Sequence, residues 1–150
     1  MNNYSILQLG EYISTIANGG TRYKPTLIKS VSSADGKSVY TVKPIVLNKI
    51  EMTVAELNTI KVGMKQVATI GTARRTFSGT GLSVAGKTGT AETGRSGDIK
   101  LYHGLFVGFS PVEKPEIAVA VVVEYAKNSS SSSARVARDI FLAYNRLKGK

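Results

Sequence analysis

The sequence Ala85-Gly86-Lys87-Thr88-Gly89-Thr90-Ala91-Glu92 is the stretch around which this chain is organised. One lysine, two threonines and two glycines occupy five consecutive positions. Glycine has no Cβ, so another backbone or a ligand can approach it closely. A lysine supplies a point charge and threonine hydroxyls supply directional donors, so a strand edge of this composition can bind a carboxylate.

The triplet Lys87-Thr88-Gly89 is one of three signatures of penicillin-binding proteins and serine β-lactamases, together with S-x-x-K and S-x-N. The longer string from Gly86 to Glu92 resembles the transpeptidase domain of a class B penicillin-binding protein. Further segments resemble that family in order and spacing: Ile16–Gly20 with Lys24-Pro25, Gly71-Thr72-Ala73, His103–Pro111, Pro115–Val119 and Ala137–Phe141.

The resemblance implies a role for each residue of this stretch. Lys87 would be catalytic, supplying positive field and supporting proton movement. Thr88 and Thr90 would bind the terminal carboxylate of the substrate or drug, and the Thr90 amide would be one of two oxyanion-hole donors. Gly89 would let the strand edge lie against the acyl group. We expect alternation along the strand to put Lys87 and Gly89 on one face and Thr88 and Thr90 on the other.

The other two signatures are absent from the chain. No serine stands three positions before a lysine, and no serine stands two positions before an asparagine. An acyl-serine enzyme needs a nucleophile beside a base. We therefore expect residues 1–150 to be the C-terminal portion of a transpeptidase domain, without the part that bears the nucleophile, and inactive alone.

Size and composition allow one domain with a sizeable core. The chain has 150 residues, 42% of them hydrophobic, and no apolar run near the roughly 18 residues that span a bilayer. We see no signal peptide. Cysteine is absent, which excludes disulfides and thiolate metal sites. The net charge of +10 favours anionic partners, although no nucleic-acid motif is present.

Periodicity and turn signals predict the elements. We expect helices over residues 5–17, 53–68 and 134–147, the second opened by a capping box at Thr53-Val54-Ala55-Glu56. We expect a β-hairpin insertion over residues 26–47, turning at Asp35-Gly36. Strands are predicted over 83–92, 101–109 and 117–124, and loops are predicted over 71–81, 93–100 and 128–133. We expect the last loop to be a mobile serine linker, with Ser133 as the cap of the final helix. The fold class is α/β (α+β): an antiparallel sheet flanked by helices, as in part of the β-lactamase/transpeptidase-like fold.

Other chemistry-bearing residues are interpreted as structural. His103, the single histidine, lies in mid-strand without a nearby nucleophile, so we expect a packed or hydrogen-bonded side chain. Nothing in the sequence brings Glu92 and Glu124 together as an acid pair. Asp98 with Glu92 is too sparse for a metal site, and we expect no metal and no cofactor.

Three functions compete at this point. The first is part of a D,D-transpeptidase that cross-links peptidoglycan, acting on stem peptides ending in D-Ala-D-Ala, binding β-lactam antibiotics and meeting other cell-wall synthesis proteins. Its location would be extracytoplasmic, on the cell-surface side of the plasma membrane. The second is a β-lactam sensor domain that shares the same strand. The third is a basic nucleic-acid-binding domain, which we disfavour because it lacks a motif.

Overall fold

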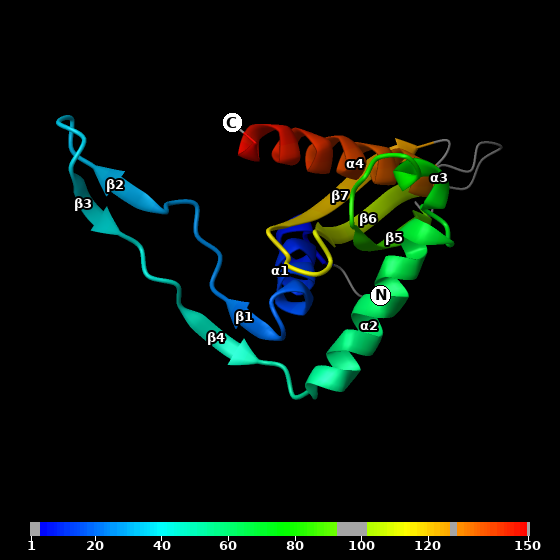
Figure 1. The fold of residues 1–150 in the computed structure, drawn as a ribbon, viewed down its shortest axis with the longest axis horizontal. Coiled ribbons are helices and arrows are strands. Elements are labelled where there is room, and N and C mark those ends of the chain that lie inside the picture. Colours follow the sequence, from blue (N-terminus) through cyan, green and yellow to red (C-terminus); the bar gives the residue numbers. More distant parts are fainter. Residues whose placement is uncertain (1–3, 93–101, 127–128, 150) are drawn as a thin grey trace.

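The computed structural model describes residues 4–92, 102–126 and 129–149 of the chain. Its centre is a three-stranded antiparallel sheet in the order β5 (Ala85–Glu92), β6 (Tyr102–Ser110) and β7 (Ile117–Ala126). Helices cover both faces of this sheet, and a long two-stranded arm extends away from it (Figure 1). The predicted α/β class with an antiparallel sheet is confirmed.

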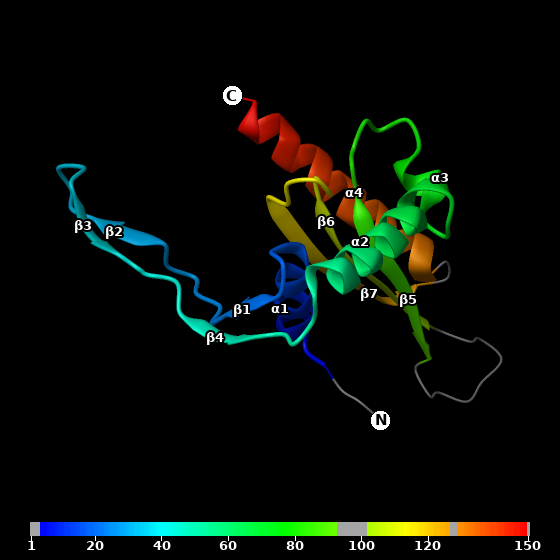
Figure 2. The same ribbon diagram turned by 60° about the horizontal axis from the view of Figure 1, so that its bottom comes forward.

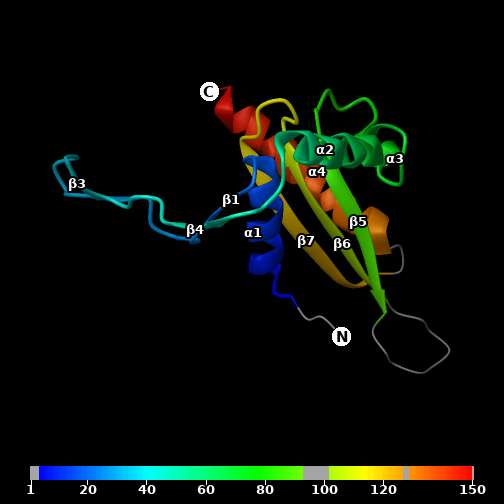
Figure 3. The ribbon, with the colours of Figure 1, turned by 90° about the horizontal axis from the view of Figure 1, so that it is seen from below.

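The sheet separates two apolar clusters. On one face, Phe106 packs with residues of α3 (Arg74–Phe77) and of α4 (Ser129–Lys148). On the other face, Phe109 packs with Ile13 and Ile16 of α1 (Ile6–Ala17). Because side chains of a strand alternate between faces, two phenylalanines three positions apart serve opposite clusters. Figure 3 shows α1 in front of the sheet and α4 behind it, which agrees with the near-continuous apolar sequence of β7.

Two helices begin with capping boxes. The Thr53 hydroxyl accepts from the Glu56 amide at 3.2 Å, and a Glu56 carboxylate oxygen accepts from the Thr53 amide at 2.7 Å, as predicted for the start of α2 (Val54–Thr69). An equivalent pair, Ser5 and Gln8, opens α1. Ser5 and Gln8 have the S-x-x-Q spacing of a capping box, so the sequence contained the signal for this second cap, although the prediction of this helix did not use it.

The end of α1 follows the predicted glycine signal. Gly19 and Gly20 adopt φ values of +87° and +101°, which side chains rarely tolerate. A Cβ on Gly20 would also lie 2.8 Å from a carbon of Ile50, so the chain must pass close to the segment that precedes α2. Both features lead the chain out of the helix and into the arm.

The expected serine loop was wrong over its described part. Helix α4 begins at Ser129, so Ser129–Ser133 are helical and Ser133, which is fully buried, lies inside the helix instead of capping it. Serine is only a moderate helix former, but its small side chain lets a helix approach a sheet closely. Ser133 and Ala134 use this property, since both are buried. Asn128 and the predicted turn over 93–100 lie outside the described residues.

A short helix interrupts the expected loop over residues 71–81. Arg74–Phe77 form α3, which turns Phe77 into the cluster around Phe106, with the two ring centroids 5.6 Å apart. Four residues are too few for a periodicity signal, so pattern reasoning assigned the segment to a loop.

The segment predicted as a hairpin over 26–47 belongs to a longer arm. At its base β1 (Thr21–Tyr23) pairs with β4 (Val46–Lys49), and farther out β2 (Ser30–Ser32) pairs with β3 (Ser38–Thr41). The Asp35-Gly36 turn closes the outer end, with Gly36 at φ +81°. Figures 1 and 2 show the arm projecting from the body in both orientations. Whether the arm is an insertion in the family sense stays a prediction.

None of the helices in the described part of the chain combines the length and apolarity needed to cross a bilayer.

Candidate functional site

Strand β5 lies at the margin of the sheet. One of its sides pairs with β6 through a regular antiparallel register, from Ala85 opposite Phe109 to Glu92 opposite Tyr102. Among the described residues, no strand pairs with the other side. An unpaired strand side of this kind can bind a ligand in extended form through backbone hydrogen bonds.

The two glycines of the stretch have different surroundings. A Cβ on Gly86 would lie 2.4 Å from the tip of the Phe106 ring, so this glycine is required by core packing. A Cβ on Gly89 would lie 3.3 Å from the Leu105 Cβ, a tight but tolerable contact, and Gly89 is half-buried. The predicted role of Gly89 beside an acyl group concerns the open side of the strand and stays a prediction.

Lys87 is exposed on β5, and its Nζ donates to the Thr88 carbonyl oxygen at 2.7 Å. None of the ion pairs between described residues involves Lys87. The ammonium group therefore remains available to an anionic ligand, because a backbone carbonyl occupies only one of its three hydrogen-bonding directions.

Thr88 is buried, and its hydroxyl oxygen lies 2.8 Å from the hydroxyl oxygen of Thr72. Thr72 belongs to the segment between α2 and α3, far from β5 in the sequence. The mutual bond uses one of two hydroxyl hydrogens, so the pair retains a second donor. The sequence identified Thr72 only within a segment of family resemblance. Its contact with Thr88 depends on how that segment crosses the strand.

A groove of about 480 Å³ runs between this strand and the C-terminal half of α2. Lys87, Thr88 and Thr72 line it, and the rest of its lining comes from α2 and the residues after it: Gly63, Gln66, Val67, Ile70 and Gly71. An ammonium group next to paired hydroxyls is suited to a carboxylate. The groove joins Lys87 and Thr88, which were predicted as site residues. The other two, Gly89 and Thr90, lie farther along β5, and Thr90 is exposed.

The strand register agrees with the expected alternation. Lys87 lies opposite Val107, which packs with the α1 cluster, and Thr88 lies opposite Phe106 of the α4 cluster. Paired residues share a face, so the two side chains belong to opposite faces. Both still line the groove because it follows the margin of the sheet.

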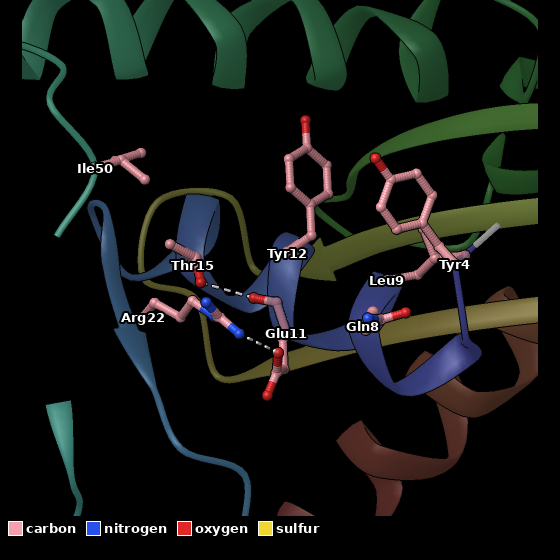
Figure 4. A pocket seen from close by; sticks show the side chains of 8 residues that line it. All are labelled: Tyr4, Gln8, Leu9, Glu11, Tyr12, Thr15, Arg22 and Ile50. Carbon is pink, nitrogen blue, oxygen red and sulfur yellow. Dashed lines mark hydrogen bonds and ion pairs between the residues drawn. The ribbon is translucent and has the colours of Figure 1, made fainter. Parts of the chain in front are cut away.

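A second hollow of about 470 Å³ lies beside α1 (Figure 4). Its lining is largely apolar and includes Tyr4, Leu9 and Tyr12. Its two charged groups form an ion pair at 3.3 Å, between Arg22 and Glu11. We place the candidate site at the groove beside β5, because no carboxylate in the described part of the chain forms an ion pair with Lys87.

His103 is half-buried, and its Nδ1 accepts a hydrogen bond from the Tyr125 amide at 3.2 Å. The expectation of a hydrogen-bonded histidine is therefore confirmed. Glu92 and Glu124 are exposed on β5 and β7, with β6 between them, so they do not form an acid pair. Asp98 lies outside the described residues. Within those residues, no three His, Asp or Glu side chains are grouped to hold a metal ion.

The chain as a whole has counterparts among known proteins. Residues 2–142 match the model of the penicillin binding protein transpeptidase domain. This chain belongs to the penicillin-binding protein transpeptidase family. Penicillin-binding protein H of Bacillus subtilis is 38% identical over 99% of this chain and 22% of its own length. Peptidoglycan D,D-transpeptidase MrdA of Acinetobacter baumannii is 32% identical over 90% of this chain and 21% of its own length.

The fold of this transpeptidase-family chain is also similar to solved structures. Penicillin-binding protein 2B of Streptococcus pneumoniae superposes with a TM-score of 0.87 and 30% identity, covering 97% of this chain and 25% of that one. The chain thus spans about a fifth to a quarter of the length of these relatives. The family agrees with the first of the three functions considered above.

Proposed function

We propose that this chain forms the carboxylate-binding and oxyanion-hole wall of a serine D,D-transpeptidase that cross-links peptidoglycan and reacts with penicillin. In this proposal the chain is the C-terminal portion of the domain, and a preceding portion carries the nucleophilic serine. The observation that supports it is the groove beside β5, where the exposed Lys87 and the Thr72–Thr88 hydroxyl pair lie together.

The reaction assigns a task to each group. The serine oxygen attacks the carbonyl between the two D-alanines, the C–N bond breaks, and D-alanine leaves with a proton on its amine. An amine of a neighbouring strand then takes the acyl group and restores the serine. A β-lactam replaces the peptide and stays attached, because its ring-opened amine remains part of the acyl group.

Lys87 supplies positive charge beside the reacting groups and supports the proton transfers. Thr88 and Thr90 hydrogen-bond the terminal carboxylate of the substrate or drug. The Thr90 amide, with the amide of the serine itself, receives the negative charge that develops on the carbonyl oxygen. A preorganised donor of this kind lowers the barrier by roughly 3–4 kcal/mol.

The same proposal includes the location and the partners. The stem peptides of peptidoglycan are met on the extracytoplasmic side of the plasma membrane, so the domain would work there. Contacts with other cell-wall synthesis proteins would be made by the whole protein. The net charge of +10 is suited to the anionic polymers of a cell wall.

Labelling with a fluorescent penicillin tests the proposal in the longer protein that carries the nucleophile. Lys87→Ala should lower the rate of acylation at least about a hundredfold, because a transition-state contact is lost. Its circular dichroism should be unchanged, since Lys87 is exposed. Lys43→Ala, which removes an exposed lysine of the arm, is the matched control.

Near-normal labelling of Lys87→Ala would refute the site. A second measurement concerns the 150-residue chain alone, which should form no covalent adduct with penicillin. An adduct would refute the proposal that the nucleophile lies in a preceding portion.

A further inference from the structure

The pairing of β6 with β7 contains an irregularity at the end of β6 that pairs with Thr90, Ala91 and Glu92 of β5. Tyr102 pairs with Ala126 and Gly104 pairs with Val123, so His103 alone faces both Glu124 and Tyr125. Two residues opposite one define a β-bulge, a feature that increases local twist and redirects side chains.

The bulge requires an unfavourable backbone conformation. Tyr125 has a φ of +52°, and it is the one non-glycine residue with positive φ in the described part of the chain. A bulky side chain in this region costs free energy, and such a residue persists only when its surroundings stabilise it.

The His103 side chain contributes to that stabilisation through two contacts with Tyr125. Its Nδ1 accepts the hydrogen bond from the Tyr125 amide at 3.2 Å. Its ring meets the Tyr125 ring edge-on, with centroids 5.0 Å apart and planes at 70°. Nδ1 can accept only when it carries no proton, so the bond requires the neutral ring with its hydrogen on Nε2.

His103 also lies next to the candidate substrate strand. On the other side of β6 it is paired with Ala91 of β5, and its neighbour Gly104 is paired with Thr90. One residue therefore connects the bulge of β7 with the part of β5 that carries the proposed oxyanion donor.

We propose that His103 is a positioning residue: by holding the Tyr125 bulge it sets the course of β6 and so the place of Thr90 and Ala91, which follow the groove residues Lys87 and Thr88 along β5. This inference rests on the proposed function. His103 does not touch the substrate, and it acts through the strand pairing alone.

The test uses acylation of the longer protein by fluorescent penicillin. His103→Leu keeps an apolar group of similar size but removes the acceptor, and it should slow acylation roughly tenfold to a hundredfold, the penalty expected from a misplaced reacting group. His103→Asn presents a carbonyl oxygen where Nδ1 was, and it should stay within about threefold of the unmodified protein. Equal losses in both variants would overturn the proposal.

Replacing Tyr125 gives an independent comparison. Glycine adopts the observed φ without strain, so in the Tyr125→Gly background the bulge no longer needs the histidine. His103→Leu should then change the acylation rate by less than about threefold relative to Tyr125→Gly alone. A full-sized loss in this background would contradict the proposal. So would failure of the double variant to fold, because the strain that His103 offsets has been removed.

Hydrogen exchange of the Tyr125 amide separates this inference from the proposed function, because it can be measured by NMR on the chain without any reaction. The amide should lose protection in His103→Leu and keep it in His103→Asn. Normal acylation by Lys87→Ala would refute the proposed function while leaving this exchange pattern standing. Normal acylation by His103→Leu, with Lys87→Ala inactive, would refute only the positioning role.

Discussion

The central sheet and the arm are both antiparallel β-structure rich in β-branched and aromatic residues, yet their surroundings differ. Phe106 and Phe109 of the sheet are 0% exposed, whereas the cross-strand pair Val31 and Tyr40 of the arm is 50% and 59% exposed. Helices cover the sheet on both faces, whereas β2 and β3 in the outer part of the arm pack chiefly against each other. A two-stranded ribbon without such cover is marginal in water.

The two regions also differ in charge. Between Thr21 and Lys49 there are six basic residues and one acidic residue, so the arm concentrates positive charge that the sheet lacks. The comparison indicates that the sheet holds the stability of this chain and that the arm contributes little. It also explains why the candidate groove lies beside the covered sheet, since a site needs rigid support.

The strongest test removes a matched aromatic ring from each region. Phe106→Ala should lower the free energy of unfolding by about 3–5 kcal/mol, because it leaves a cavity beside Phe77 and Phe141. Tyr40→Ala should change it by less than about 0.5 kcal/mol, because the ring is exposed. Urea denaturation of the 150-residue chain measures both. Similar losses would mean that the arm is part of the folded core.

Glycine-to-alanine substitutions should affect stability differently at a tightly packed glycine and at a glycine with open space around it. Gly86→Ala should destabilise the chain by about 1–3 kcal/mol, because the new Cβ collides with the Phe106 ring. Gly10→Ala, in α1 with open space around it, should be stabilising by up to about 1 kcal/mol. Thermal unfolding followed by circular dichroism compares the two. A tolerated Gly86→Ala would show that packing against Phe106 does not require glycine at this position.

The junction of arm and body is the next test. Thr53→Ala removes the cap of α2 where the chain leaves the arm, and it should lower the free energy of unfolding by about 1 kcal/mol. Thr59→Ala makes the same change at an exposed site within α2 and should be neutral or slightly stabilising. Equal effects in urea denaturation would show that the capping box does not stabilise the helix.

The smallest effect concerns acid stability. The Lys65 ammonium and the Ser83 hydroxyl lower the pKa of Glu113 from 4.5 to about 2, and the Lys65 contact joins α2 to the connection between β6 and β7. A carboxyl group whose pKa is lower in the folded state stabilises the fold above pH 4.5 and loses that effect as the pH falls toward 2.

Glu113→Gln should therefore flatten the decline of the urea midpoint between pH 4.5 and 2. The remaining decline has other sources, because the pKa of Glu56 is also lowered, by its hydrogen bonds to Thr53. The pKa of Asp35 in the arm is lowered too, chiefly by the Ser33 hydroxyl. Asp35→Asn in the arm is therefore the variant to compare with Glu113→Gln in the body. A larger effect from Asp35→Asn would reverse the ranking of the two regions.

Particular residues show how far pattern reasoning reached. The Thr53-Glu56 spacing predicted the start of α2, and alternation placed Lys87 and Thr88 on opposite faces of β5. The same reasoning misplaced Ser129–Ser133, because a serine run has the composition of a linker and its helical state depends on close packing over the sheet. It left open whether Gly86 makes room for a ligand or for another part of the chain, and the Phe106 ring occupies that room.

The sequence alone determined where helices α1 and α2 begin, which runs are strands, and that a lysine and two threonines share one strand. Caps, periodicity and turns are interactions between residues a few positions apart, so they can be read along the chain. Only the tertiary structure brought Thr72 to Thr88 and opened the groove beside Lys87. Likewise, the contact between His103 and Tyr125 depends on strand register and on a bulge within it, which no local pattern specifies.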